Sequence, residues 1–361
     1  MPASAALLAP PVPPPEGSAP AERFISVVIP NRNGAATIGQ CLAAALASDY
    51  RRFEVVVVDD GSEDASVEIA RRFPCRLVRL PRRSGVSRAR NAGARAARGE
   101  ILLFIDSDCL LSRDTLALAN VSFGDRRDRV LGGTYTPVPH DRDFYSAFQS
   151  AFIHHFETKR RQPDYVAAHA MVIDADLFRR SGGFVEGSFI GLAASVEDVE
   201  LSHRLRRQGC RLAVDPALQV THVFRFSLRR SLANAVKKAR YWTMYSLANR
   251  DLLSDSGAAS LELKANVLCA LLAAGLVGAA LAGGAAWPLA AIPPLLALDL
   301  LVNRRLAAAW LAAGGPGFAA LAVLYYLTLY AAAVAVGGAL GALHYVWSIR
   351  LRGRYRPCTP R

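Results

Sequence analysis

The fold of this chain is decided by the stretch Ile101-Leu102-Leu103-Phe104-Ile105-Asp106-Ser107-Asp108. Five apolar residues that end at a charge are typical of a buried strand in a parallel sheet. In open α/β sheets, ligands bind at the carboxyl ends of the strands. Asp106 and Asp108 would repel each other there unless a cation joins them, and carboxylate oxygens suit Mg²⁺ or Mn²⁺. An Asp-rich turn that caps the next element is the alternative, and this stretch alone does not decide between the two.

Strands and helices alternate on both sides of this stretch. Strands are expected at 24–30, 53–58, 76–80, 101–105 and 166–173, and helices at 37–47, 62–73, 87–98, 175–180 and 197–208. Such alternation indicates βαβ units, and therefore an α/β domain with a mainly parallel, Rossmann-like sheet. The aromatic and basic run within 135–165 is expected to be helical and exposed.

Hydrophobic residues are concentrated in the last third of the chain. They make up 52% of the 361 residues, and the mean hydropathy is +0.20. The composition predicts five regions: a disordered lead-in (1–22), an α/β domain (23–225), an amphipathic interfacial helix (226–255), a transmembrane region (265–347) and a basic tail (348–361). We therefore expect a membrane protein with a soluble head.

The number of membrane crossings is not fixed by the sequence. A span needs about 20 apolar residues. The charge-free stretch after Lys264 has room for two short spans that turn near 283–288, and the stretch after Arg305 has room for one span at about 318–346. Basic residues at 303–305 and 350–356 should both be cytoplasmic, which requires an even number of crossings between them. Either 306–316 is then re-entrant, or this rule does not hold here. Three and four spans both remain open.

Charge and cysteine content limit the class of partner and the compartment. The net charge of +13 suits anionic lipid or phosphorylated small molecules, and no nucleic-acid-binding motif accompanies it. Much of this charge lies beside the apolar segments, where anionic cytoplasmic lipids would attract it. The six cysteines are scattered singly, so they indicate neither a zinc site nor a disulfide framework, and a reducing compartment fits best.

Four motifs in a fixed order carry a resemblance to a known family. Strand SVVIP-N-R-N is followed by VVVVDDGSED, by GVSRARNAGARAARGEILLFIDSD, and then by RSGGF and EDVELSHRL. This order resembles the family 2 glycosyltransferases with a GT-A fold, and specifically their membrane-anchored bacterial members. The resemblance covers about residues 24–225, with a weaker match in the tail.

The resemblance implies a site for a nucleotide-diphosphate sugar. The residues that it places around the donor are Pro30, Arg32, Asp59, Asp60, Arg90, Asn91, Asp106 and Ser107, with Arg88 nearby. Asp59 or Asp60 would accept a hydrogen bond from the nucleotide base of the donor. An Asx turn that caps the helix at Ser62 is an alternative or additional role. Arg88, Arg90 and Asn91 would contact phosphate or ribose of the donor, and a solvated arginine face is the alternative.

The resemblance also implies a divalent metal and a catalytic base. Asp106 and Asp108 match the family's DxD motif: Asp106 would reach the ribose or the water shell of the metal, and Asp108 would bind the metal directly. His222 is a possible further ligand. Asp198 matches the catalytic base, with Glu197 beside it as a less favoured candidate. The alternative is that this acidic pair merely caps its helix.

The expected function is transfer of a sugar, with inversion, to a hydroxyl of a membrane-associated acceptor. Gly182, Gly183 and His169 would frame the acceptor pocket. The acceptor would be a polyprenyl-linked saccharide or a glycolipid at the cytoplasmic face of a bacterial inner membrane, in a multi-pass protein of cell-envelope polysaccharide biosynthesis. Nucleotide sugar, the acceptor and membrane lipids are the expected partners, and nucleic acid is not.

Three other functions are weighed against this one. A polyprenyl-phosphate glycosyltransferase needs no base, and the acidic pair counts against it. A processive polysaccharide synthase usually carries a QxxRW motif, whereas 237–242 reads KKARYW. A degenerate sugar-binding scaffold would be expected to lose the DxD motif or the acidic pair, and both are present.

Overall fold

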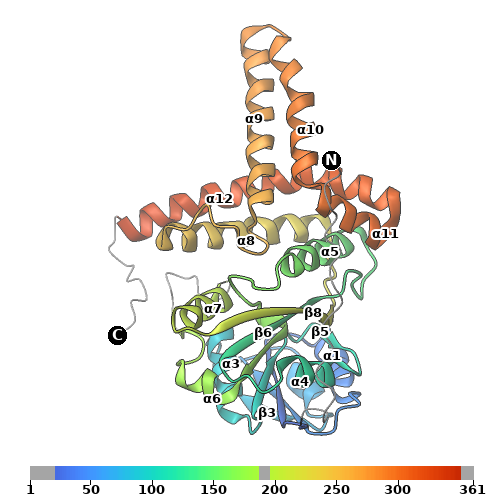
Figure 1. Cartoon of the computed structure of the whole chain (residues 1–361), viewed down its shortest axis with the longest axis vertical. Helices are drawn as coiled ribbons and strands as arrows, with labels where there is room; N and C mark the ends of the chain where they lie inside the picture. Colours follow the sequence, from blue (N-terminus) through green and yellow to red (C-terminus); the bar gives the residue numbers. More distant parts are fainter. Residues whose placement is uncertain (1–20, 187–195, 351–361) are drawn as a thin grey trace, which may run out of the picture.

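A mixed sheet forms the centre of the first two thirds of the chain. The computed structural model describes residues 21–186 and 196–350 (Figure 1). The sheet has eight strands in the order β3-β2-β1-β4-β7-β6-β8-β5. The strands are β1 (Ile25–Asn31), β2 (Phe53–Asp59), β3 (Arg76–Arg79), β4 (Ile101–Phe104), β5 (Cys109–Leu111), β6 (Arg129–Tyr135), β7 (Met171–Asp174) and β8 (Arg211–His222).

The strand directions confirm the expected α/β fold. Strands β1, β2, β3 and β4 run parallel to one another, and β6 runs parallel to β8, whereas β7 is antiparallel to β4 and β6 and β5 is antiparallel to β8. The first half of the sheet is therefore a parallel, Rossmann-like sheet, and the second half is mixed. Strands β1 and β4 are buried along their whole length because their side chains are almost all apolar.

Helices cover both faces of this sheet. They are α1 (Ile38–Leu46), α2 (Ser66–Ala70), α3 (Val86–Ala96), α4 (Thr115–Phe123), α5 (Phe144–Thr158), α6 (Ala175–Arg180) and α7 (Glu197–Arg207), with the 3₁₀ turn η1 (Ala168–Ala170). Helix α3 lies against β1 and β2 because Gly93 has no side chain. A Cβ at this position would overlap Val28 and would lie 3.0 Å from Val58. This close approach brings the polar side of α3 to the carboxyl ends of the strands.

The helix expected within 135–165 is present, but it is not exposed. Phe148, Phe152 and Phe156 of α5 are buried. Helix α11 from the apolar tail covers them (Figure 1), and Trp310 of α11 stacks on Phe148 with 5.1 Å between ring centroids. The expectation was wrong because the covering surface comes from a segment more than 150 residues away, which the local pattern of α5 does not reveal.

The last third of the chain consists of helices. They are α8 (Leu228–Asn249), α9 (Leu261–Gly283), η2 (Trp287–Ala291), α10 (Ile292–Val302), α11 (Arg304–Tyr325), η3 (Tyr326–Tyr330), α12 (Ala331–Tyr345) and η4 (Val346–Arg350). Ser227 and Ser260 begin α8 and α9 as N-caps, because each side chain accepts a backbone N–H of the first turn. Helix α11 is interrupted at Gly315, whose φ is 78°, before Pro316.

Two of these helices are long and apolar enough to cross a membrane, judged by length and composition. They are the 23-residue helix Leu261–Gly283 and the 45-residue run Arg304–Ser348. The helix Trp287–Val302 is apolar but shorter. This is fewer than the three or four spans expected from composition. Most of the lead-in (1–22) and of the basic tail (348–361) lies outside the described residues.

Candidate active site

The carboxyl ends of β1, β2 and β4 bring the predicted donor residues to one edge of the sheet. Pro30 and Asp59 are paired in register with neighbouring strands, and both are buried. Ser107 follows β4 and lies beside the turn after β1, near Gly34. Arg32 lies in the same turn, and its guanidinium is 3.8 Å from Glu63. The parallel register therefore gathers these residues as the sequence predicts.

Asp59 and Asp60 are buried, and each accepts backbone hydrogen bonds. Asp59 accepts from the N–H of Ser62 at 3.2 Å, which is the turn-capping role considered from the sequence. Asp60 accepts from the N–H groups of Ser84 at 2.5 Å and Gly85 at 2.8 Å. These carboxylates therefore tie the loops after β2 and before α3 together. The contact of Asp59 or Asp60 with the nucleotide base of a donor stays a prediction.

Arg90 of α3 connects the DxD segment to the acidic pair. Its side chain is 4% exposed, and it donates to Asp106 Oδ1 at 2.7 Å and to Glu197 Oε1 at 2.6 Å. The guanidinium also lies 5.4 Å from the centre of the Phe184 ring. A planar guanidinium can hold two carboxylates in fixed directions, which a lysine cannot do. In this structure Arg90 thus fixes one carboxylate with respect to the other.

Asn91 and Gly183 hold the segment after α6. The Asn91 amide donates to the carbonyl of Phe184 at 2.7 Å and accepts from its N–H at 2.9 Å. Gly183 has a φ of 65°, and a Cβ there would lie 2.6 Å from Asn91 Oδ1. Arg88 is paired with Glu186 at 3.0 Å. The predicted contact of Asn91 with the donor stays a prediction. So does the predicted contact of Gly182 and Gly183 with the acceptor. Residues 187–195 lie outside the described residues.

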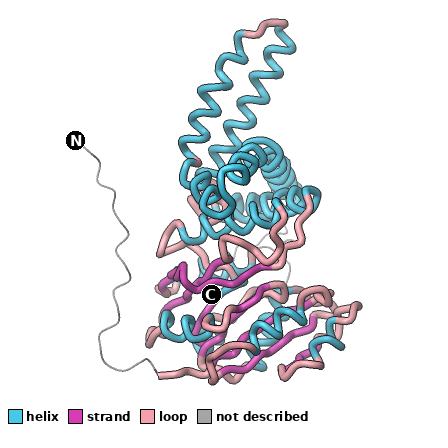
Figure 2. The backbone as a smooth tube through the Cα atoms, turned by 90° about the vertical axis from the view of Figure 1, so that its right-hand side faces the viewer, coloured by secondary structure: helices cyan, strands magenta, loops and turns pink. Residues whose placement is uncertain are grey.

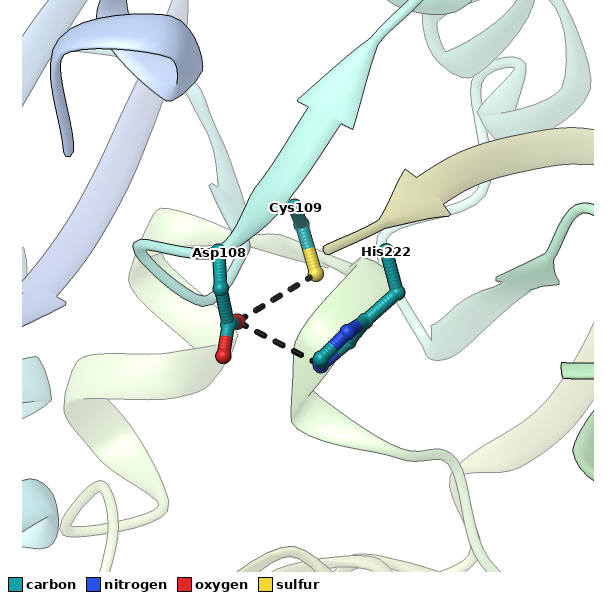
Figure 3. Close-up of side chains that lie close together, drawn as sticks. All are labelled: Asp108, Cys109 and His222. Atoms are coloured by element: carbon teal, nitrogen blue, oxygen red, sulfur yellow. Dashed lines mark hydrogen bonds and ion pairs between the residues drawn. The ribbon is translucent and has the colours of Figure 1, made fainter. Parts of the chain in front are cut away.

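Asp108 and His222 form a pair that could hold a cation (Figure 3). The Nε2 of His222 is 3.4 Å from Asp108 Oδ1, because β5 and β8 pair with Cys109 opposite His222. The side-chain ligand atoms of Asp108, Cys109 and His222 lie within 4.8 Å of one another. Burial lowers the pKa of His222 to about 3, so its ring is neutral and can bind a metal.

Cys109 is the poorest ligand of this group. Burial, with Asp108 and Asp106 nearby, raises the pKa of its thiol far above the ordinary value, so the sulfur keeps its proton. A protonated thiol does not bind Mg²⁺ or Mn²⁺, which prefer oxygen. The carboxylate and the imidazole fit a divalent cation, and the buried Nδ1 of His222 has no partner among the described residues. The sequence analysis did not select Cys109, although it adjoins the DxD motif.

The two carboxyl groups of the DxD segment have opposite pKa shifts. Burial disfavours ionisation of both. For Asp106 the neighbouring Arg90 and His169 more than compensate, so its pKa is lowered. For Asp108, burial and the charge of Asp106 raise the pKa to about 7. A cation beside Asp108 would remove this penalty, which is the electrostatic argument for a metal at this position.

The acidic pair begins α7, as the sequence predicts. Asp198 accepts from the N–H of Ala168 at 3.2 Å and from that of Val199 at 2.9 Å. Glu197 uses one oxygen for Arg90, and its buried Oε2 has no partner among the described residues. Burial raises the pKa of both carboxyl groups. A raised pKa is what a general base needs to accept a proton near neutral pH.

His169 lies behind the DxD segment. It belongs to η1, is 8% exposed, and stacks on Tyr135 with 4.0 Å between ring centroids. Its Nε2 is 3.3 Å from Glu157 Oε2. Burial opposes protonation, but Glu157 outweighs it, so the pKa of His169 is raised. Neither Glu157 nor Tyr135 was selected from the sequence, because both lie on elements whose contact with η1 only the fold reveals.

Helix α8 touches helix α7, which begins with the acidic pair. Val196 and Val199, on either side of the acidic pair, form an apolar cluster with Met244 and Tyr245 of α8. The Tyr245 hydroxyl is 2.8 Å from Nδ1 of His203 on α7. The basic helix is thus part of the wall of the site.

Comparison with known proteins agrees with this geometry. Residues 26–181 match the sequence model described as Glycosyl transferase family 2. This part of the chain belongs to the family 2 glycosyltransferases. It is the domain of a transferase enzyme, as the order of the sequence motifs indicates. The fold resembles that of a mannosyltransferase from Pyrobaculum calidifontis, with a TM-score of 0.55 and 22% identity over 91% of this chain and 90% of that one.

Two curated relatives show how far the sequence similarity extends. The pre-mycofactocin glycosyltransferase of Mycobacterium tuberculosis is 28% identical over 238 residues, which cover 63% of this chain and 47% of the relative. Glycosyltransferase AglE of Haloferax volcanii is 41% identical over 93 residues, which cover 24% of this chain and 31% of the relative. The matches span less than half the length of these relatives.

Proposed function

We propose that the chain transfers a sugar from a nucleotide-diphosphate sugar to a hydroxyl of a membrane-associated acceptor, with inversion at the anomeric carbon. One observation carries the proposal: Arg90 holds the DxD segment and the acidic pair on either side of a single guanidinium. The edge of the sheet can therefore present a metal-binding carboxylate and a basic carboxylate to the same substrate. The donor would lie across Arg32, Asp59, Asp60 and Asp106.

A divalent metal suits the donor side of this site. Held by Asp108 and His222, it would supply positive charge for the departing diphosphate. The mannosyltransferase of similar fold is described in complex with GDP-mannose and Mn²⁺, which supports a nucleotide sugar and a divalent metal here. Asp106 keeps one oxygen for Arg90 and has the other for the ribose or for the water shell of the metal.

Asp198 is our candidate for the base. It would take the proton of the acceptor hydroxyl as that oxygen attacks the anomeric carbon from the face opposite the diphosphate. Its two backbone hydrogen bonds orient the carboxylate without a direct ion pair. Glu197 is less suitable because its ion pair with Arg90 stabilises the charged form and weakens it as a base.

A donor screen tests the proposal. Detergent-purified protein is mixed with UDP-, GDP- and dTDP-sugars in the presence of Mn²⁺, Mg²⁺ or EDTA, and thermal stabilisation and donor hydrolysis are measured. We expect one nucleotide class to stabilise the protein only with metal. Asp108→Asn should lose this effect, and Cys109→Ser, its matched control, should keep it. No response to any nucleotide sugar would contradict the proposal.

A phosphate acceptor is the second candidate, and one observation favours it. Lys238 on α8 is exposed, and its charge acts on both His169 and His222. A cation whose charge reaches these two histidines suits a polyprenyl phosphate acceptor, for which no base is needed. Lys238→Gln should then raise KM for a short-chain polyprenyl phosphate, whereas Lys237→Gln, the exposed neighbour, should not. If the Asp198→Asn variant keeps its turnover, the result would favour a polyprenyl phosphate as the acceptor.

The proposed location is the cytoplasmic face of a bacterial inner membrane. The apolar helices of the tail and the exposed basic residues of α8 (Arg229, Arg230, Lys237 and Lys238) support it. In this position the site opens beside lipid, which suits a lipid-linked saccharide of the cell envelope. Recovery of the full-length protein in the membrane fraction, and its release only by detergent, is the measurement that checks it.

A further inference from the structure

The apolar helices of the tail take two orientations. Helices α9 and α10 stand side by side and project away from the transferase domain, whereas α8, α11 and α12 run across their base (Figure 1). The second view shows the same arrangement, with the hairpin of α9 and α10 standing on a layer of helices above the domain (Figure 2). Helix α9 and the run Arg304–Ser348 have similar hydropathy, but they are oriented differently with respect to the transferase domain.

The inner face of α11 is attached to the transferase domain. Besides Trp310 on Phe148, Phe318 packs on Phe144 at 5.6 Å and Tyr325 packs on Phe148 at 4.9 Å between ring centroids. The Tyr325 hydroxyl donates to Ser231 of α8 at 2.9 Å. A helix that is packed along a soluble domain in this way cannot cross the bilayer at the same time.

The inner face of α12 is attached to α8. A Cβ on Gly341 would lie 2.5 Å from the carbonyl oxygen of Arg240, and one on Gly337 would overlap the backbone of Val236. These glycines, four residues apart, allow the two helix backbones to touch. Arg240 Nη2 also lies 2.7 Å from Nδ1 of His344. Helix α12 therefore follows the basic helix α8 along its length.

The outer face of this layer is apolar and uncovered. The exposed large side chains along α11, η3, α12 and η4 are Leu311, Leu321, Leu324, Leu329, Val336, Leu340, Leu343, Val346 and Trp347. The hairpin exposes a second set on α9, η2 and α10, including Leu281 and Trp287, each 79% exposed. The exposed apolar side chains therefore lie both on the layer and on the projecting hairpin. Large exposed apolar surfaces mark sites that bind a protein partner or a membrane.

Polar groups mark the level at which the hairpin leaves this layer. The sequence has no charge between Lys264, in the first turn of α9, and Asp299, in the last turn of α10. Asp299 is 1% exposed and accepts from Asn303 at 2.7 Å, and Asn303 in turn accepts from the hydroxyl of Tyr326 in η3 at 3.1 Å. Arg304 and Arg305 follow at once and are exposed. The polar end of the hairpin is thus level with α11 and η3.

We propose that the chain enters the lipid bilayer only through the hairpin of α9, η2 and α10. The layer of α11, η3 and α12 lies flat in the headgroup region of the leaflet next to the transferase domain. Helix α9 has 23 residues and reaches about 34 Å, enough to cross the hydrocarbon core. The exposed Trp287 at the tip then lies at the far interface, where tryptophan is favoured. No crossing follows Arg305, so the basic residues at both ends of α11–η4 stay on one side.

Two measurements on the full-length protein test this topology. A fluorescent protein that matures only in the cytoplasm is fused after Arg361 in one strain and before Met1 in another. We expect both fusions to fluoresce. Fluorescence of only one would mean an odd number of crossings and would overturn the proposal. Two further crossings after Arg305 would also give fluorescence of both, so depth must be measured as well.

Depth is measured in nanodiscs of phosphatidylcholine and phosphatidylglycerol. Nitroxide labels are attached to single cysteines at Leu321, Val336 and Leu343, in a background without native cysteines, and depth is read from relative accessibility to oxygen and to a nickel chelate. We expect the three positions to lie at equal depth near the headgroups, and labels at Leu272 and Leu281 of α9 to lie at different depths. If the label at Val336 lies deeper than the labels at Leu321 and Leu343, this segment spans the membrane and the proposal is wrong.

Discussion

Arg90 and Glu197 are 107 residues apart in the sequence, and the guanidinium Nη1 donates to Glu197 Oε1 over 2.6 Å. Arg90 comes from the helix before the DxD strand, and Glu197 from the helix that carries the proposed base. The side chain of Glu197 is 10% exposed, so little solvent screens the pair. The contact thus sets the position of the acidic pair relative to Asp106, whose carboxylate shares the same guanidinium.

Arg90→Lys should lower kcat and leave KM for the nucleotide sugar nearly unchanged. Lysine keeps the charge but cannot hold two carboxylates in fixed directions. A displacement of about 1 Å in a catalytic group can cost about 100-fold in rate, and we expect a loss of this order. Steady-state kinetics over a range of donor concentrations provides the measurement. A large rise in KM with kcat retained would instead show that Arg90 binds the donor, the role that the family resemblance implies.

Asp198→Asn should reduce turnover by about 10²- to 10⁴-fold, the usual contribution of a general base. The carboxylate uses Oδ2 for the N–H of Ala168 and Oδ1 for that of Val199, so the amide keeps only one of these two hydrogen bonds, and thermal unfolding of the variant checks that the fold is retained. Donor affinity, measured by calorimetry, should change little. Glu197→Gln is the neighbouring control, and its loss should be smaller. If both variants lose turnover to the same extent, Asp198 cannot be identified as the base.

Stabilisation by Mn²⁺ should be greater at pH 8 than at pH 5.5. Because the pKa of Asp108 in the folded protein is raised, from an ordinary 3.8 to about 7, the metal-free fold binds this proton more tightly than the unfolded chain does. The group therefore favours folding at low pH, and this contribution is lost as pH rises from about 4 to about 7. A metal must displace the same proton, so its binding improves over this range.

Thermal unfolding with and without Mn²⁺ at the two pH values checks this expectation. Asp108→Asn removes both the titrating group and the metal ligand, so this variant should show neither the pH dependence nor the stabilisation. An equal rise in Tm at pH 5.5 and pH 8 in the unaltered protein would place the metal elsewhere.

The sequence was sufficient for the parallel half of the sheet because each signal there is local. The apolar run before Asp106 is a strand, and the Gly and Asp residues at the strand ends mark the loops that meet at the site. Parallel pairing of β1, β2 and β4 then brings those loops together without further information. His222 was harder to place because its contact with Asp108 depends on the antiparallel pairing of β5 with β8.

The burial of α5 and the orientation of α11 and α12 could not be predicted in this way. Hydropathy measures how apolar a segment is, and it has nearly the same value, 2.1 and 2.0, for the two candidate helices. The two helices differ in what they pack against. Trp310 of α11 stacks on Phe148 of α5, whereas Leu281 of α9 is exposed. Such long-range packing leaves no periodic signal in either segment alone. The charge rule requires an even number of crossings between the basic residues on both sides of α11–η4, and the flat layer that we propose satisfies it with none.

Gly341→Ala should destabilise the protein, whereas Gly338→Ala should not. The added methyl at position 341 would lie 2.5 Å from the carbonyl oxygen of Arg240, so α12 must move away from α8, at a cost of about 1–3 kcal/mol. At position 338 the nearest atom is Thr243 Oγ1 at 3.7 Å, an ordinary contact, and alanine there gains helix propensity of up to about 1 kcal/mol. Thermal unfolding of both variants in the same detergent provides the comparison. Equal Tm values would mean that α12 is not in backbone contact with α8, and the layer built on that contact would have to be rejected.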